Sequence, residues 1–501
     1  MLFRPGRRQA APPVTTVPGA TTGGQHGTGG ALRRGTDDDA LFTMSLSAER
    51  FPAGASPVTI RAHVPGTVRA SLEELNGRWV VVARSVSGHH RGALTRADGD
   101  SIADAAHRAL EERVPFVVVL SSSGSEVTEG IDALHGWGVA ASGMATCSGT
   151  VPILAGVTGA AISGPALLLG LADVTVMTPD AFAYVSGPDA VEAFTGIKVG
   201  LRELGGATVH ATASGLCAMV APDADDVLPL LGSVLTYLPD HADAEPPRLD
   251  TDDPVDRPTP ELAEAIPAAA SASYDVRQIV TAFADDAEVL ELRPGWAPQL
   301  VTALVSIGGM PAGVVANQPR ALAGTLDIRA SQKGARFVRF CDAFNLPIVT
   351  LVDTPGFLPG KDLEWRGMIR HGAELAFAYA EASVPRVCLV MRKAYGGAYI
   401  VMDSKGMGND ICLAWPSAEI AVMGAQGAVQ ILHRGADSEE RRRLQDDYAA
   451  ELLTPWVAAE RGFVDEVIDP VDTRSALGRA LSMLASRREH LAARKHDAGP
   501  L

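Results

Sequence analysis

The sequence predicts an α/β protein made of two copies of one strand–turn–helix unit. The main observation is a repeat at a spacing of about 233 residues, in which the apolar runs 115–120 and 347–352 enter the turns 121–124 and 353–356. A second observation is that strands alternate with helices along both halves, an order that favours a mostly parallel sheet covered on both faces. We therefore expect two similar domains, each with its own core.

The same spacing returns at two glycine-rich turns. Ser163-Gly164 in the first half and Gly396-Gly397-Ala398 in the second each follow an apolar run. Backbone N–H groups at such turns can stabilise a developing oxyanion, so the duplication predicts two facing anion-stabilising sites. Glycine at a strand-to-helix turn is also commonly needed only for a positive φ or for close packing, and this alternative stays open.

The first half is predicted to alternate strands with helices. A strand at 78–83 precedes an amphipathic helix at 101–110, for which Ser101 is the expected N-cap, and a further strand at 115–120 follows. We place this first domain at residues 46–240. The next stretch is rich in Pro, Asp, Glu and Ala, so residues 241–275 are predicted to be a linker.

The second domain, at residues 276–501, repeats this plan. Its helix is predicted to lie on the sheet through Ala335 and Val338 and to turn Lys333, Arg336 and Arg339 toward solvent. The predicted elements are a strand at 311–316, a helix at 330–344, a strand at 347–352 and charged helices at 438–452 and 474–491. We expect the polar faces of the last two helices to be solvated.

Composition excludes several classes of protein. Of the 501 residues, 47% are hydrophobic and 20% are charged, which is enough for two cores of ordinary size. The net charge of −16 argues against a nucleic-acid partner, because phosphate backbones are bound by clustered Lys and Arg. The five cysteines have no CxxC or other zinc-like spacing, so we expect no metal site, but buried thiols in a reducing cytoplasm.

Two segments could be mistaken for targeting or membrane elements. Residues 1–45 are rich in Gly, Thr, Pro and Gln and contain no apolar run of signal-peptide length, so a disordered tail is predicted. Residues 148–172 carry no charge and are long enough to cross a bilayer. Their prolines and glycines would break a spanning helix but suit a strand, a turn and a buried helix, so we expect no membrane segment.

Several motifs together identify a family. In the second half they are Asn317-Gln318-Pro319, 337–345, 352–357, 392–399 and 423–429, and thinner ones in the first half are Glu129-Gly130, 186–189 and 204–207. From about residue 78 to the C-terminus, the chain resembles the carboxyltransferase (β) subunit of biotin-dependent acyl-CoA carboxylases, especially the propionyl-CoA carboxylase β type. The resemblance implies tandem crotonase/ClpP-like domains, and a hexamer whose active sites lie between the first domain of one subunit and the second domain of another.

The resemblance also implies a reaction. In this family the carboxylate of carboxybiotin moves to the α-carbon of an acyl-CoA, which places negative charge first on the ureido oxygen and then on the thioester oxygen. The reaction thus forms two oxyanions, and each of the two glycine-rich turns could stabilise one of them. The chain has no Ala-Met-Lys-Met segment to carry biotin, so we expect carboxybiotin on a separate biotin carboxylase/biotin carrier subunit.

The family assigns roles to particular residues. Matching places the catalytic amides at Ser163-Gly164, which we assign to the thioester enolate, and at Gly397-Ala398, which we assign to biotin. The expected substrate-binding residues beside them are Gly396, Tyr399, Ile400, Gly424, Ala425 and Gln426. No side-chain base is required, and His135, His210, His371 and His433 are interpreted as packing or surface residues.

Four residues depart from the family pattern. Glu126 replaces an arginine, Ser163 replaces a glycine, and the pair Ser163-Gly164 is followed by Pro165, which has no N–H. A Cβ at Ser163 could narrow the site or forbid the backbone angle of a glycine. Ile400 stands where propionyl-type relatives carry an acidic residue, which indicates a more apolar or differently shaped acyl pocket.

Three functions are compatible with these observations. The first is an active acyl-CoA carboxyltransferase. The second is a biotin-independent acyl-CoA decarboxylase, in which the enolate site is kept and the biotin site is idle. The third is a degenerate, non-catalytic subunit of a mixed carboxylase hexamer, which Glu126 and Ser163 would support.

Overall fold

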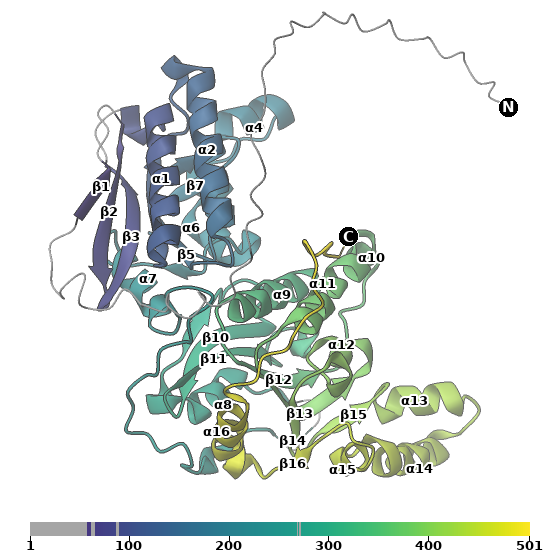
Figure 1. Ribbon diagram of the computed structural model, residues 1–501. Coiled ribbons are helices and arrows are strands. Elements are labelled where there is room, and N and C mark those ends of the chain that lie inside the picture. The colour runs from purple at the N-terminus through teal and green to yellow at the C-terminus, as the bar shows by residue number, and fades with distance from the viewer. Residues whose placement is uncertain (1–57, 62–65, 87–89, 268, 270–271, 501) are drawn as a thin grey trace, which may run out of the picture. The chain divides into compact units, whose positions relative to one another are not determined.

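The computed structural model describes residues 58–61, 66–86, 90–267, 269 and 272–500. The tail predicted at 1–45 lies outside the described residues. The described chain forms two eight-stranded sheets of the same topology, each covered by helices (Figure 1). The predicted α/β duplication is therefore confirmed.

The first sheet has the strand order β1-β2-β3-β4-β5-β6-β8, and β7 pairs with β5. Strands β1 to β3 form an antiparallel meander, and parallel pairing begins between β3 and β4. The strands are β1 (Val58–Arg61), β2 (Val68–Leu75), β3 (Arg78–Ser85), β4 (Phe116–Ser122), β5 (Ile153–Ile162), β6 (Val174–Met177), β7 (Phe182–Tyr184) and β8 (Met219–Val220). The strands predicted at 78–83 and 115–120 correspond to β3 and β4.

The second sheet repeats this order as β16-β14-β13-β12-β11-β10-β9, and β15 pairs with β13. All residues of β10, β11 and β12 are buried, as expected for strands covered on both faces. The strands are β9 (Leu290–Leu292), β10 (Leu300–Ile307), β11 (Met310–Asn317), β12 (Ile348–Thr354), β13 (Arg386–Tyr395), β14 (Ile411–Ala414), β15 (Glu419–Ala421) and β16 (Glu466–Val467).

A pair of long helices packs on each sheet (Figure 1). In the first half these are α1 (Arg96–Glu112) and α2 (Ile131–Cys147), and in the second half α9 (Ile328–Ala343) and α11 (Met368–Glu381). Helices α1 and α2 touch through their backbones, because a Cβ at Gly99 would lie 2.0 Å from the carbonyl oxygen of Gly136.

Shorter helices complete both halves. They are α3 (Gly164–Leu168), α4 (Pro188–Thr195), α5 (Leu201–Gly205), α6 (Ala207–Val209), α7 (Val227–Leu235), α8 (Val276–Phe283), α10 (Lys361–Trp365), α12 (Gly396–Val401), α13 (Ala425–Leu432), α14 (Ser438–Tyr448), α15 (Pro455–Glu460) and α16 (Thr473–Leu484). The charge-free segment 148–172 contains β5 and α3, as predicted. No helix in the described part of the chain is both long and apolar enough to cross a membrane.

The linker predicted at 241–275 has little regular structure among its described residues, but it is anchored along the second half. Thr259 donates its N–H to the carbonyl of Val471 at 2.8 Å. The side-chain amide of Asn345 donates to the carbonyls of Ala242 and Ala244, at 2.6 and 2.9 Å. These contacts hold the segment on the second half, and at its start Ala242 also donates its N–H to the carbonyl of Thr150 in the first half, at 2.8 Å.

Three details of the sequence prediction are wrong. Ser101 is not an N-cap: α1 begins five residues earlier, where Thr95 and Asp98 form a capping box, and the Ser101 hydroxyl donates to the carbonyl of Ala97 within the helix. Lys333 does not face solvent but is only 2% exposed. The helix predicted at 474–491 ends at Leu484, because the chain then turns to bring Arg487 against Asp410 at 2.7 Å.

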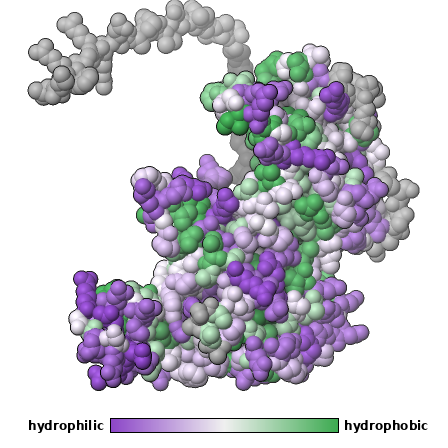
Figure 2. Space-filling model, turned by 180° about the vertical axis from the view of Figure 1, so that it is seen from behind, coloured by the Kyte–Doolittle hydropathy of each residue, from purple (hydrophilic) through white to green (hydrophobic). Residues whose placement is uncertain are grey.

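The charged helix predicted at 438–452 ends at Tyr448 and continues as one π-helical turn, Ala449–Leu453. None of the residues of α14 is buried. On the face shown in Figure 2, this part of the molecule lies at the lower left and is mostly hydrophilic. The polar face of this helix is therefore solvated, as predicted.

Candidate active site

The two predicted sites are built by the same strand–turn–helix arrangement. β5 leads into α3, and β13 leads into α12. Each strand extends beyond the main sheet by pairing with a short parallel strand, β7 or β15. Ser163, the first residue after β5, therefore corresponds to Gly396, the first residue after β13. The predicted pair Ser163-Gly164 thus begins one residue earlier in the duplicated unit than the pair Gly397-Ala398.

The hydrogen bonds of the first turn limit what it can offer a ligand. Ser163 donates its N–H to the carbonyl of Tyr184 at 2.9 Å, so this amide is already used within the fold. Pro165 has no N–H. Of the predicted first pair, only the Gly164 amide remains for a substrate.

The second turn has more donors. α12 begins at Gly396, and the first N–H groups of a helix have no acceptor within that helix. Gly397 and Ala398 occupy the second and third positions, so both amides belong to this class. Of these two residues only Gly397 is exposed, so its amide is the donor of this turn that an oxyanion can reach.

Ser163 adopts the backbone conformation that its glycine counterpart would adopt. Its φ of 62° and ψ of −135° lie in a region that is normally restricted to glycine, and φ is 58° at the equivalent Gly396. A residue with a Cβ held in such a conformation stores about 1–3 kcal/mol of strain. The serine thus does not forbid the turn, but it strains it.

Aromatic side chains cover the two turns differently. A Cβ placed on Gly164 would lie 2.8 Å from the indole ring of Trp137, which comes from α2. A Cβ on Gly397 would meet only Phe357, at an ordinary 3.6 Å. Phe357 belongs to a motif that identified the family, whereas no sequence signal pointed to Trp137.

A cavity of about 640 Å³ lies beside the second turn. Four of the predicted residues line it: Gly396, Gly397, Tyr399 and Ile400. Ile400 is 45% exposed and lines this space, whereas Tyr399 is buried, and burial raises the pKa of its phenol. The opposite walls, which the sequence did not reveal, are formed by residues 420–422, Tyr448, Leu452, Val457, Ala458, Arg461 and Phe463.

The remaining predicted residues lie outside this lining. Ala398 is completely buried, its backbone included, whereas its neighbour Gly397 is exposed. Gly424 is the N-cap of α13, which begins at Ala425 and Gln426. The ring of Tyr395 lies on Gly424, where a Cβ would approach it to 3.2 Å. Gly424, Ala425 and Gln426 therefore form the turn that leads from β15 into α13, and they do not line the cavity.

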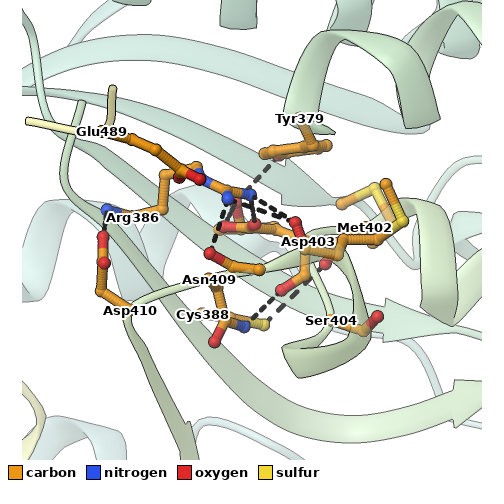
Figure 3. Close-up of polar contacts among 12 residues, drawn as sticks. Tyr379, Arg386, Cys388, Met402, Asp403, Ser404, Asn409, Asp410 and Glu489 are labelled. Atoms are coloured by element: carbon orange, nitrogen blue, oxygen red, sulfur yellow. Dashed lines mark hydrogen bonds and ion pairs between the residues drawn. The ribbon is translucent and has the colours of Figure 1, made fainter. Parts of the chain in front are cut away.

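A buried ion pair holds another wall of the cavity, formed by residues 404–406 (Figure 3). Arg386 contacts Asp403 at 2.6 Å, and the two side chains are 1% and 0% exposed. The guanidinium also donates to the carbonyls of Met407 and Gly408, at 3.2 and 2.6 Å. Burial raises the pKa of Asp403 to about 6, although Arg386 opposes this shift.

The first half contains a matching cavity of about 490 Å³ beside α3. Its lining includes Ala166 and Leu167, which correspond in the duplication to Tyr399 and Ile400. Residues 183–185 at the end of β7 likewise correspond to residues 420–422 at the end of β15. The fold therefore builds the same kind of cavity twice.

Glu126, the residue that reverses a family charge, has a local role. Its carboxylate accepts hydrogen bonds from the N–H and the hydroxyl of Thr128, at 3.0 and 2.7 Å, and the residue is only 7% exposed. It thereby caps the turn Val127–Glu129.

The histidines are placed mostly as predicted. His135 and His433 are exposed, and His371 contacts Glu374 at 2.7 Å. His210 lines the first cavity, where its ring nitrogens lie 2.7 Å from the Ser214 hydroxyl and 2.8 Å from the carbonyl of Ala183. This Ser–His contact was not expected from the sequence.

Together these features define a class of protein, a duplicated α/β fold that presents backbone amides beside two matching cavities. The family model described as "Carboxyl transferase domain" matches residues 58–498. The chain therefore belongs to the carboxyl transferase family, as its motifs predicted. The family and the structural likeness below confirm the expected tandem crotonase-like fold.

Individual relatives agree with this membership. The carboxyltransferase subunit of propionyl-CoA carboxylase from Haloferax mediterranei is 41% identical over 435 residues, which cover 85% of this chain and 84% of that protein. The propionyl-CoA carboxylase beta chain of Saccharopolyspora erythraea is 42% identical over 446 residues, covering 85% and 82%. A hexameric transcarboxylase 12S structure with methylmalonyl-coenzyme A bound has a TM-score of 0.85 and 39% identity, covering 87% of this chain and 85% of that one.

Proposed function

We propose that this chain is the carboxyltransferase component of a biotin-dependent acyl-CoA carboxylase. Its reaction transfers a carboxylate from carboxybiotin to the α-carbon of an acyl-CoA. The observation that supports this best is the duplicated turn beside duplicated cavities, in a chain that belongs to the carboxyl transferase family.

The proposed chemistry needs oxyanion stabilisation more than it needs a side-chain acid or base. When bound, carboxybiotin would supply the carboxylate and, after losing it, the base for the α-proton. The chain contributes the amide of Gly397 for one oxygen and the amide of Gly164 for the other. A preorganised donor of this kind typically contributes about 3–4 kcal/mol to the transition state. The largely apolar walls beside Gly397 suit an uncharged ring system, so the residues present fit biotin.

The acyl substrate is proposed from the relatives and from Ile400. The relatives are named for propionyl-CoA and methylmalonyl-CoA, which supports propionyl-CoA or a related acyl-CoA as the substrate. Ile400 exposes an aliphatic side chain where the propionyl type carries an acidic group. We infer a more apolar acyl pocket than that of the propionyl enzymes.

The assembly is proposed from the same family. The transcarboxylase 12S neighbour is described as a hexamer, and we infer a homo- or hetero-hexamer for this chain as well. Biotin would arrive on a separate biotin carboxylase/biotin carrier subunit, and the complex would act in the cytoplasm.

Two variants of Gly397 test the proposed function. The enzyme is purified with a biotinylated partner subunit, and ATP-dependent fixation of labelled bicarbonate is followed on a panel of acyl-CoAs. Gly397→Pro removes one N–H at a helix position that tolerates proline, and it should abolish transfer while the assembled size is unchanged. Gly397→Ala keeps the N–H and fits beside Phe357, so it should retain transfer. Transfer that persists in the proline variant would refute the role of this amide.

A non-catalytic subunit is the second candidate, because Trp137 covers Gly164, the one donor that the first predicted pair offers. Absence of transfer with every acyl-CoA, together with restored activity of an added active paralogue, would favour this candidate.

A further inference from the structure

We propose that a cavity beside the middle of α9 binds a phosphate or phosphate-monoester group. The cavity has a volume of about 360 Å³ and is separate from the one beside Gly397. Its walls come from α9, from α11, from residues 293–296 after β9, and from Ser214-Gly215 of the first half. This binding site is distinct from the amides proposed for the transfer reaction.

The lining is strongly cationic. Lys333, Arg293, Arg336 and Arg339 all contribute to it, and Glu374 is the one acidic residue in it. The carboxylate of Glu374 already contacts His371 at 2.7 Å. Two of the cations are also engaged elsewhere: Arg336 pairs with Asp173 at 2.8 Å, and Arg339 lies 4.0 Å from Glu381.

The other two cations make no direct ion pair among the described residues, although Glu291 acts on Lys333 and Asp173 acts on Arg293 from a greater distance. Within the described residues, no carboxylate lies within ion-pair distance of Lys333 or Arg293. The ammonium of Lys333, on a residue only 2% exposed, donates to the carbonyls of Arg293 and Trp296 at 2.8 and 2.9 Å, which leaves its third proton free. Two unpaired positive charges at one cavity call for a ligand with about two negative charges.

Several further donors at this cavity also lack an acceptor. Arg293 donates its Nε–H to the carbonyl of Gly215 at 2.8 Å, and its two terminal nitrogens have no hydrogen-bond acceptor in the described part of the chain. The indole nitrogen of Trp296 is buried without a partner among the same residues. A buried donor left unpaired costs about 1–3 kcal/mol. An oxyanion would satisfy these groups together, and the planar arginine suits phosphate in particular.

The shape of the site allows an ester as well as free phosphate. The cavity shares Ser214, Gly215, Arg293 and Arg336 with the first-half cavity of about 490 Å³. The body of a phosphate monoester could therefore extend along the apolar side of that larger space. Phosphate with two charges matches the two unpaired cations better than a singly charged carboxylate does.

Proton uptake gives an additional signature. Burial lowers the pKa of Lys333 to about 7 and that of Arg293 to about 10. A bound anion favours the charged lysine, so binding near pH 8 should take up a proton. The charged groups around Lys333 are Glu291 on β9, Arg277 on α8, Arg293 after β9, Arg336 and Arg339 on α9 itself, and Glu374 on α11.

Calorimetric titration of the full chain with inorganic phosphate tests the proposal, with chloride exchanged to keep the ionic strength constant. We expect one phosphate per chain and proton uptake at pH 8. Lys333→Met and Arg293→Gln should each raise the dissociation constant for phosphate at least tenfold. Arg366→Gln removes an exposed cation outside the cavity and should change it less than twofold. Circular dichroism shows whether each variant is folded. If one of the two cavity variants does not fold, the other alone tests the proposal.

A second arm distinguishes the source of the phosphate group. CoA and dephospho-CoA, which lacks the 3′-phosphate, are titrated into the wild type and into Lys333→Met. A tenfold preference for CoA that disappears in the variant identifies the 3′-phosphate of CoA as the ligand, whereas phosphate binding without such a preference identifies a free phosphate or another monoester. The absence of saturable binding of both phosphate and CoA, or binding that neither cavity substitution weakens, would overturn the proposal.

Discussion

Replacing Arg386 with methionine should destabilise the second domain strongly. The substitution keeps most of the volume but leaves Asp403 buried without its partner, and it also removes the donors for the carbonyls of Met407 and Gly408. Removing one member of a buried ion pair typically costs about 3–5 kcal/mol. We expect the free energy of unfolding, measured by guanidinium denaturation with circular dichroism, to fall by about that amount.

The pH dependence of this loss follows from Asp403. Its pKa in the folded chain is raised from 3.8 to about 6, so its contribution to stability is fully present below pH 3.8 and is lost as the pH rises through 6. Without Arg386 the pKa of Asp403 rises further, so the deficit of Arg386→Met should be larger at pH 8 than at pH 5. The double variant Arg386→Met/Asp403→Leu should recover much of the loss, because no unpaired charge remains. A deficit below about 1 kcal/mol at pH 8, or one that grows as the pH falls, would refute this reasoning.

Three further outcomes are expected. Ser163→Gly should relieve backbone strain and raise the free energy of unfolding by about 1–3 kcal/mol in a denaturation experiment, and a lower value would show that the serine is unstrained. Lys333→Met should stabilise the protein more at pH 7 than at pH 10 in thermal melts. The pKa of Lys333 is depressed from 10.5 to about 7, so the stability contributed by the neutral amine is complete above pH 10.5 and is lost as the pH falls to 7. Ile400→Asp should change the ratio of kcat/KM between long and short acyl-CoAs at least tenfold in favour of the short chain, and an unchanged ratio would remove Ile400 from the acyl pocket.

The repeat in the sequence predicted the architecture well, because strands and glycine turns are local features. The apolar run 347–352 became β12, and the helix predicted at 330–344 spans Ile328–Ala343. Both predictions depend on periodicity within a few residues, which burial in the sheet then reinforces.

Contacts between distant segments account for what the sequence could not predict. Lys333 has the spacing of a surface residue, yet residues 293–296 fold over it and supply carbonyl acceptors. Trp137 gave no signal, because only the packing of α2 brings it onto Gly164. The Ser163 amide was predicted to serve a substrate, but the partner that engages it, Tyr184, is about twenty residues away on β7.

The cavity that is built twice has an evolutionary consequence. Each cavity is supported by its own sheet and by its own short parallel strand, β7 or β15. Leu167 can therefore be substituted without displacing its counterpart Ile400. Selection can therefore alter the preference of one chamber for its ligand while the other keeps its shape. A duplicated scaffold of this kind can acquire a new ligand preference in one cavity without having to redesign the other.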